Sequence, residues 1–321
     1  MIPPRANEHF AGHEGAVAAL YEAAAGKRLH HAWLIGGQAG IGKKTLAYRF
    51  ARWLLAGGTS SDLSVDPGHP VSKRVAAGTH VDLRTIERRF NEKTKKMQSI
   101  IAVDTVREIK QFFHLTAGEG GWRIVVVEGA EDLNFEAQNA LLKQLEEPPK
   151  QGILLLVTDA PSRLLPTTRS RCRVLNLAPL ADAQVGGLLA NYAPELGEDV
   201  RQKLVRLAEG SIGTALMLAQ ETGMAMASLV DEALAGPVAP ARAQAIADGI
   251  SRTEDGFPLF MSLLRAGLAA GTRAAARRGG DAKLAGRVTV WQELGRLERE
   301  VEHLYLDKRA AVVVALSQLH G

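Results

Sequence analysis

Cysteine is nearly absent from this 321-residue sequence, which contains only Cys172. A single cysteine excludes an internal disulfide and a four-cysteine zinc module. His69 and His80 are therefore expected to be loop residues rather than metal ligands, and no metal site is predicted. Long apolar runs are also lacking. The longest, 153–157 and 310–316, are far shorter than the roughly 20 residues that a membrane-spanning helix needs.

The N-terminal segment lacks the apolar core of a secretion signal, because Pro, Arg, Asn and Glu interrupt its first ten residues. Together with the single cysteine, this predicts a cytoplasmic protein. A large excess of one charge is lacking as well, since 39 Lys and Arg stand against 35 Asp and Glu, for a formal net charge of +4. So mild an excess is compatible with contact with DNA, but it is also usual on solvated helices.

A glycine-rich segment at 37–45 has the spacing of a phosphate-binding loop. The pattern is a glycine, four residues, Gly-Lys and then Ser or Thr. Gly37, Gly42 and Lys43 match it. In such a loop backbone N–H groups surround the phosphates, and the lysine reaches the β and γ oxygens.

The loop departs from the pattern at the position that binds Mg²⁺. Lys44 stands where the metal-binding hydroxyl should be, and Thr45 lies about 100° further round the following helix. We therefore predict a degenerate loop in which ATP or ADP can dock but is not hydrolysed, and the residues leave its occupancy open. The expected nucleotide-binding residues are Gly37, Gly40, Gly42, Lys43 and Thr45.

Short apolar runs alternate with helical patterns before and after this loop. Several of the runs lack polar alternation, as do strands buried on both faces of a parallel sheet. The predicted strands are 32–35, 81–86, 124–127, 153–157 and 173–176. The loop then lies between the first strand and a helix at 45–55, as the motif requires. The stretch 57–78, rich in Gly, Ser, Asp and Pro, is predicted to be a loop.

A charged run at 87–96 follows the second predicted strand. It contains Arg88, Arg89, Lys93, Lys95 and Lys96. We interpret it as a solvated surface excursion, and contact of these side chains with DNA stays open.

Strand patterns end near residue 179, and the remainder is helical. Segments 181–192, 198–208 and 211–220 predict three short helices, as in a small lid. Beyond residue 224 the sequence is rich in Ala and Leu, with helix breaks at 236–240 and 277–280. The predicted domains are 1–178, 179–223 and 224–321.

The groups that hydrolyse ATP are missing at the end of the third strand. There a working P-loop ATPase has an Asp that holds Mg²⁺ through water, often followed by a Glu that polarises the attacking water. Here Glu128 takes the place of the Asp and Gly129 that of the Glu. A shifted register could bring Glu131 or Asp132 to this place, but they lie past the strand end and are expected to cap the helix around Asn134.

Four motifs occur in a specific order along the chain. They are Leu-His-His-Ala-Trp-Leu at 29–34, Gly-Ile-Gly-Lys at 40–43, Asn-Ala-Leu-Leu-Lys with Leu-Glu-Glu-Pro-Pro at 139–149, and Ser-Arg-Cys at 170–172. Together they resemble the bacterial clamp-loader branch of the AAA+ ATPases. The resemblance is strong over 29–172, fainter at 210–211 and weak in the last third, where 306–309 is the best match. It implies an α/β AAA+ P-loop domain with a parallel five-stranded sheet, a helical lid and an all-helical C-terminal collar that joins an oligomer.

Within this branch, the departures at Lys44, Glu128 and Gly129 resemble a subunit that does not hydrolyse ATP rather than the motor subunit. Gly213 also stands where the motor subunit has an arginine that contacts its own nucleotide. In the family, the arginine of Ser-Arg-Cys points at ATP bound to the neighbouring subunit, which implies that Arg171 acts in trans. A guanidinium suits the charge on a transferring phosphoryl group. The alternative for Arg171 is a surface salt bridge, with Arg163 and Arg169 as competitors, and Cys172 is expected to pack in the core.

The resemblance also implies partners. They are motor subunits that hydrolyse ATP and a clamp-opening subunit in a pentameric ring, with the sliding clamp and primed DNA met through the assembly. Two alternatives remain from the residues. One is an active AAA+ ATPase that uses Lys43 and Thr45, weakened by Gly129; the other is a small-molecule kinase with a lid, weakened by the pairing of Ser-Arg-Cys with the motif at 139–149.

Overall fold

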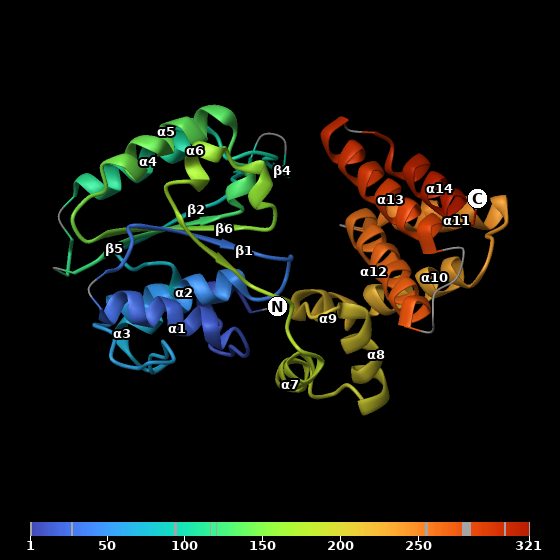
Figure 1. Cartoon of the computed structure of the whole chain (residues 1–321), viewed down its shortest axis with the longest axis horizontal. Helices are drawn as coiled ribbons and strands as arrows, with labels where there is room; N and C mark the ends of the chain where they lie inside the picture. The colour runs from blue at the N-terminus through green and yellow to red at the C-terminus, as the bar shows by residue number, and fades with distance from the viewer. Residues whose placement is uncertain are drawn as a thin grey trace. The chain divides into compact units, whose positions relative to one another are not determined.

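The computed structural model describes residues 2–26, 28–92, 95–115, 117–119, 121–253, 256–277, 284–304 and 306–320. The chain forms two compact units, one made of Met1–Leu188 with Gly210–Gly213 and the other of Leu189–Glu209 with Thr214–Gly321. The first is built around a sheet and the second is helical (Figure 1). The three predicted domains, with boundaries after residues 178 and 223, stay a prediction.

The sheet of the first unit has the five predicted strands, and every pair in it is parallel. They are β1 (Ala32–Gly36), β2 (Leu83–Ile86), β5 (Arg123–Glu128), β6 (Gly152–Thr158) and β7 (Arg173–Asn176). Their spatial order is β2-β5-β6-β1-β7. All residues of β1 and β6 are buried, which explains why these strands are continuous apolar runs.

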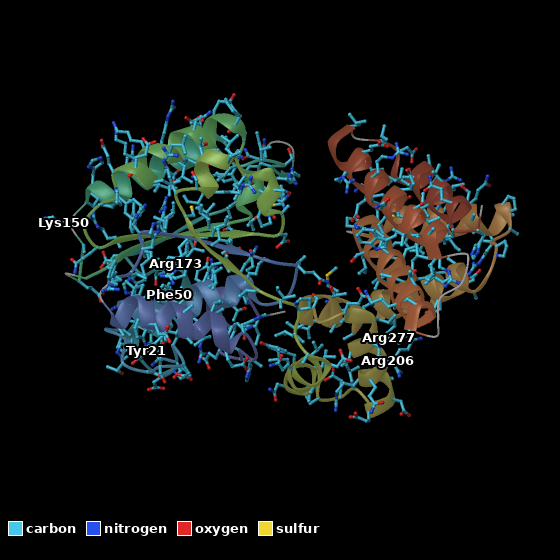
Figure 2. All side chains as sticks on the ribbon, viewed as in Figure 1. Tyr21, Phe50, Lys150, Arg173, Arg206 and Arg277 are labelled. Carbon is cyan, nitrogen blue, oxygen red and sulfur yellow. The ribbon has the colours of Figure 1, made fainter. Side chains whose placement is uncertain are left out.

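Helices cover both faces of this sheet (Figure 1). On one face lie α1 (Glu14–Ala25), α2 (Lys43–Leu55) and α3 (Pro70–Ala77); on the other lie α4 (Val103–His114), α5 (Phe135–Glu146) and α6 (Pro166–Arg169). Successive strand residues face opposite cores, so Leu155 belongs to the core that contains Phe50 of α2, and Leu156 to the core that contains Leu141 of α5. Figure 2 labels Phe50, and also Arg173, whose guanidinium lies 4.9 Å from the centroid of a Trp33 ring.

The prediction that 57–78 is a loop is wrong at its C-terminal end, where α3 forms. His69 accepts a hydrogen bond from the Val71 N–H as the helix N-cap, Pro70 is the first helical residue, and Gly78 ends the helix with φ +71°. Val71 and Val75 are buried against the core of α2. Pro and Gly, which indicated a loop by composition, mark the two ends of a short helix.

The charged run forms the predicted surface excursion, with a short antiparallel hairpin of β3 (Phe90–Asn91) and β4 (Lys96–Met97). Several of its cations pair within the chain. Arg88 pairs with Asp132 (3.3 Å), Arg89 with Glu108, and Lys95 with Glu92 (3.3 Å). Lys93 and the side chain of Lys96 lie outside the described residues. Contact of this run with DNA stays a prediction.

The rest of the described chain is helical, as predicted. From residue 278 on, the break predicted at 277–280 lies outside the described residues. Its helices are α7 (Asp182–Tyr192), α8 (Glu198–Ala208), α9 (Ile212–Leu218), α10 (Glu221–Ala235), α11 (Pro240–Arg252), α12 (Gly256–Arg277), α13 (Leu284–Leu304) and α14 (Lys308–Gln318). In the second unit α12 packs against α10 and α13, and α11 against α14. Asp307 caps α14 by accepting the N–H groups of Arg309 and Ala310. None of the described helices is both long and apolar enough to cross a membrane.

Candidate phosphate-loop site

The glycine-rich loop connects β1 to α2, as the motif requires. Gly37, Gly40 and Gly42 have φ values of +145°, +74° and +100°, a backbone region that residues with a Cβ rarely adopt. A Cβ on Gly37 would also lie 2.6 Å from the carbonyl oxygen of Leu177. The loop therefore needs its glycines for its shape alone. It leads directly into the N-terminus of α2, and the N-terminus of a helix favours a bound anion.

The parallel order of the strands brings two acidic residues to this loop. Glu128 ends β5 and Asp159 follows β6, and β6 pairs with both β5 and β1. The carboxyl ends of parallel neighbours lie at one edge of a sheet, which is also where the loop leaves β1. The two carboxylates thus reach the two lysines of the loop.

Lys43, the lysine expected to bind phosphate, is buried and engaged within the chain. Its Nζ donates to the carbonyl oxygen of Gln38 at 2.5 Å and forms an ion pair with Asp159 Oδ1 at 2.6 Å. Its side chain is 3% exposed, against 51% for Asp159. A buried ammonium requires such a partner, because an unpaired charge in a poorly solvated site is costly.

Lys44, the residue at the metal position, forms an ion pair with Glu128, whose Oε2 lies 2.7 Å from its Nζ. The other carboxylate oxygen, Oε1, accepts the hydroxyl of the buried Tyr48 at 2.7 Å. Thr85 of β2 lies 2.9 Å from the same hydroxyl. Burial, and then the charge of Glu128, raise the pKa of Tyr48, so the phenol stays a proton donor at neutral pH. Both oxygens of Glu128 are therefore engaged.

Residues 210–213, which precede and begin α9, pack directly on the loop within the first unit. The Ser211 hydroxyl donates to the carbonyl oxygen of Ala39, and the Gly213 N–H to that of Gly40, both at 2.9 Å. A Cβ added to Gly213 would lie 2.8 Å from the Cα of Gly40. A motor subunit has an arginine at this position, whereas this chain has Gly213. The backbone of Gly40 lies so close to it that no side chain has space there.

Gly213→Ala is accordingly expected to destabilise the first unit by about 1–3 kcal/mol, the usual range for overpacking. Gly187→Ala in α7 is the matched control, because nothing lies within 4 Å of its added Cβ, and alanine in a helix gains about 0.5–1 kcal/mol over glycine. Urea unfolding followed by tryptophan fluorescence measures both. Equal stabilisation by the two changes would contradict the close approach of Gly213 to Gly40.

The carboxylates that follow Gly129 are engaged by other groups of the chain. Glu131 Oε1 accepts the N–H of Asp159 at 3.0 Å, and Asp132 pairs with Arg88. Neither of them caps the next helix, contrary to prediction. Asn134 itself caps α5, accepting the N–H of Ala137, because the N-cap oxygen must come from the residue that immediately precedes the helix.

Arg171 lies just after α6, at the surface of the first unit. Its Nη2 is 2.7 Å from Glu146 Oε1, its Nη1 donates to the carbonyl oxygen of Thr167 at 3.0 Å, and its side chain is 36% exposed. The salt bridge weighed as the alternative thus exists in the isolated chain. To act in trans, the Arg171 guanidinium must leave Glu146 and bind a phosphate of the nucleotide on the neighbouring subunit.

Cys172 packs beside the core of α5, as predicted. Its Sγ donates to the carbonyl oxygen of Thr168 at 3.3 Å, and burial raises the pKa of the thiol to about 12. The thiolate is therefore scarce at neutral pH, and Cys172 is a structural residue rather than a nucleophile.

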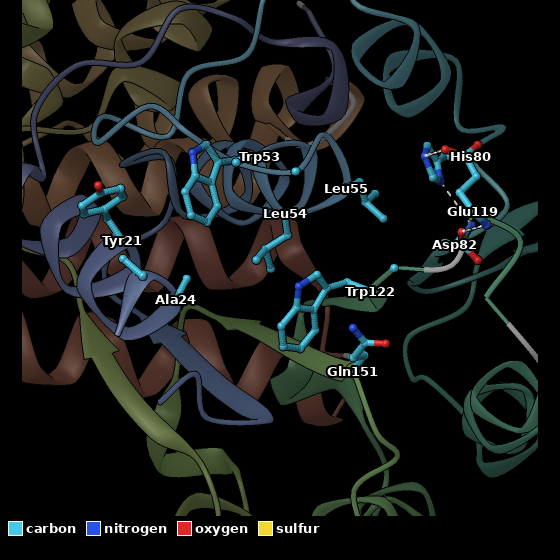
Figure 3. Close-up of a pocket in the computed structure, with 14 residues that line it drawn as sticks. Tyr21, Ala24, Trp53, Leu54, Leu55, His80, Asp82, Glu119, Trp122 and Gln151 are labelled. Carbon is cyan, nitrogen blue, oxygen red and sulfur yellow. Dashed lines mark hydrogen bonds and ion pairs between the residues drawn. The ribbon is translucent and has the colours of Figure 1, made fainter. Parts of the chain in front are cut away.

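A cavity of about 500 Å³ lies at the opposite end of α2, about 20 Å from the loop at 1.5 Å per helical residue. Figure 3 shows Tyr21, Trp53 and Trp122 on its apolar side and His80 near Glu119 on its polar side. Burial lowers the pKa of His80, which keeps the imidazole neutral. No group of three or more potential metal ligands occurs among the described residues.

The strand order, the loop and the residues that contact it define an α/β AAA+ P-loop fold. The family model described as "DNA polymerase III, delta subunit" matches residues 12–181. The chain belongs to this family.

Individual relatives agree with this assignment. The chain is 39% identical over 207 residues to DNA polymerase III subunit delta' of Pseudomonas aeruginosa, covering 62% of this chain and 59% of that one. It is 37% identical over 203 residues to the delta' subunit of Escherichia coli K12, covering 63% and 57%. It is also 28% identical over 258 residues to the tau subunit of the same strain, covering 78% and 36%. The chain thus spans less than two thirds of the length of each of these relatives.

Proposed function

We propose that this chain is the delta-prime subunit of a bacterial DNA polymerase III clamp loader, which loads the sliding clamp onto primed DNA in replication at the expense of ATP. The observation that carries the proposal is the Lys44–Glu128 ion pair, which occupies the place where a working P-loop ATPase holds Mg²⁺. The same chain keeps the Ser-Arg-Cys motif. The delta' relatives support it.

In this role the chain is not itself a catalyst. It supplies Arg171 in trans to the nucleotide of a neighbouring gamma/tau motor subunit, and its helical C-terminal part joins the collar of the ring. The similarity to a tau subunit supports membership of one assembly, since related folds pack around a ring in similar ways. The clamp-opening delta subunit, the sliding clamp and primed DNA are the further partners, in the cytoplasm.

The alternative of an active AAA+ ATPase is not favoured. It requires a metal site and a base, whereas both oxygens of Glu128 are engaged by Lys44 and Tyr48, and Gly129 has no side chain. No observation favours a small-molecule kinase.

Co-purification tests the proposal. The full chain, carrying an affinity tag, is mixed with the gamma/tau and delta subunits of the same organism and isolated. We expect a complex of fixed stoichiometry that loads clamps onto primed DNA, whereas mixtures without the chain should load poorly. A chain that stays monomeric beside active gamma/tau and delta subunits would refute the assignment.

The isolated chain is expected to show no ATP hydrolysis above background, because Lys44, Gly129 and Gly213 replace the metal-binding hydroxyl, the catalytic carboxylate and the arginine that contacts the nucleotide in a motor subunit. A steady-state phosphate-release assay measures this, with Lys43→Ala as the control. A turnover of about 1 per second or more, abolished by Lys43→Ala, would show that the chain is an ATPase.

A further inference from the structure

The phosphate loop is joined to the sheet by an internal network of charges. Lys43 pairs with Asp159, from the end of β6, and Lys44 pairs with Glu128, at the end of β5. Each lysine therefore has a carboxylate partner from a different strand. An ATPase of this fold needs those positions for other contacts, since the lysine binds phosphate and the acidic residue at the strand end holds the metal.

A Mg²⁺-bound nucleotide does not fit the residues at this site. Mg²⁺ takes oxygen ligands in near-octahedral geometry, usually carboxylates, waters and phosphates. Both oxygens of Glu128 already have partners, because Oε2 binds Lys44 and Oε1 accepts the Tyr48 hydroxyl. The Lys44 ammonium, 2.7 Å from that carboxylate, would also repel a divalent cation placed beside it.

The phosphate position is likewise engaged from within. Asp159 presents a carboxylate to Lys43 at 2.6 Å, and the Gln38 carbonyl oxygen lies at 2.5 Å from the same ammonium. The backbone of Asp159 is anchored by its N–H bond to Glu131. A γ-phosphate would have to displace this carboxylate before it could reach Lys43.

We propose that Lys44 and Asp159 are internal substitutes for the two charged parts of a Mg²⁺-nucleotide: Lys44 replaces the cation at Glu128, and Asp159 replaces the phosphate at Lys43. The network holds α2, β5 and β6 together without a nucleotide. Ser211 and Gly213 close over the outer side of the loop by contacts that also need no ligand. The chain therefore keeps the shape of a nucleotide-binding domain but does not bind the Mg²⁺-nucleotide.

The inference rests on the non-catalytic role proposed above, but it concerns the isolated chain and is tested without partners. A chain that does not co-purify with the other subunits would not contradict this inference, and a failed binding test would not contradict the proposed role in the assembly.

The test measures binding of a fluorescent ADP to the full chain, with and without Mg²⁺, for the original sequence and for the double variant Lys44→Thr with Asp159→Asn. The original chain is expected to show no saturable binding at about 1 mM ligand. The double variant, with a hydroxyl restored at position 44 and Lys43 released, should bind with a Kd below about 10 µM in Mg²⁺, a gain of about 100-fold or more.

Lys203→Thr with Asp231→Asn is the matched control, because it removes a solvent-exposed Lys–Asp pair of 3.1 Å in the second unit and should leave binding absent. Two outcomes would overturn the proposal. One is Mg²⁺-dependent micromolar binding by the original chain, and the other is a double variant with a native circular dichroism spectrum that still fails to bind.

Thermal unfolding provides a second readout that does not depend on a fluorescent ligand. Asp159→Asn alone leaves the buried Lys43 without its carboxylate, so its unfolding midpoint should fall. Inorganic pyrophosphate, used as the probe, should restore the midpoint of this variant and leave that of the original chain unchanged. A midpoint of the original chain that rises with pyrophosphate as much as that of the variant would mean that Asp159 does not occupy the phosphate position.

Discussion

Arg171→Ala is expected to slow ATP hydrolysis at one neighbouring motor site by about 10³ to 10⁵, the range for an arginine finger supplied in trans. The complex should still assemble, because the lost cation acts on charge that develops during the reaction. The other motor sites keep their own arginines, so the total ATPase rate of the assembly should fall only partly. Clamp loading, which needs the sites to act together, should suffer more. Rapid-quench hydrolysis and clamp loading on primed DNA measure the two effects.

The surroundings of Arg171 supply the controls. Arg169→Ala, two residues earlier, should change ATP hydrolysis and clamp loading only slightly. Glu146→Gln removes the carboxylate that holds Arg171 in the isolated chain, so it should leave loading at least as fast as before. An assembled Arg171→Ala complex that loads clamps at the unaltered rate would assign Arg171 to the salt bridge alone.

Removal of the helices from α10 onward is expected to abolish incorporation into the oligomer when nucleotide is absent. The reason is that contacts made through the nucleotide-binding domains change with ATP, whereas a collar must hold the ring together throughout the cycle. A chain ending at Gln220 is mixed with the motor and clamp-opening subunits and passed over a size-exclusion column. We expect it to elute separately, whereas the full chain co-elutes.

The fragment from Glu221 to the end of the chain is the complementary arm and should co-elute without the first unit. Circular dichroism of both pieces establishes that each is folded before mixing. Stoichiometric co-elution of the shortened chain without nucleotide would place the assembly surface before Glu221 instead of in the collar.

Much of the fold follows from local patterns. Strands β1, β5 and β6 were predictable because each is an apolar run of a length typical of buried strands, and the helices of the second unit because Pro240 and similar breaks separate them. α3 was missed because Pro70 and Gly78, taken with their polar neighbours, indicate a loop by composition. The burial of Val71 and Val75, which favours a helix there, depends on α2 and is not visible locally.

The sequence by itself determined that this chain has a phosphate loop, that a lysine replaces the metal-binding hydroxyl, and that Gly129 and Gly213 lack catalytic side chains. These are properties of single positions in a motif, so spacing reveals them. Only the tertiary structure decided that Lys43 pairs with Asp159, that Lys44 pairs with Glu128, and that Gly213 approaches Gly40 too closely for a side chain. The physical reason is that these partners lie far apart in the sequence. The ion pairs form because adjacent parallel strands end at the same edge of the sheet, beside the loop, and Gly213 meets Gly40 because residues 210–213 pack on that loop.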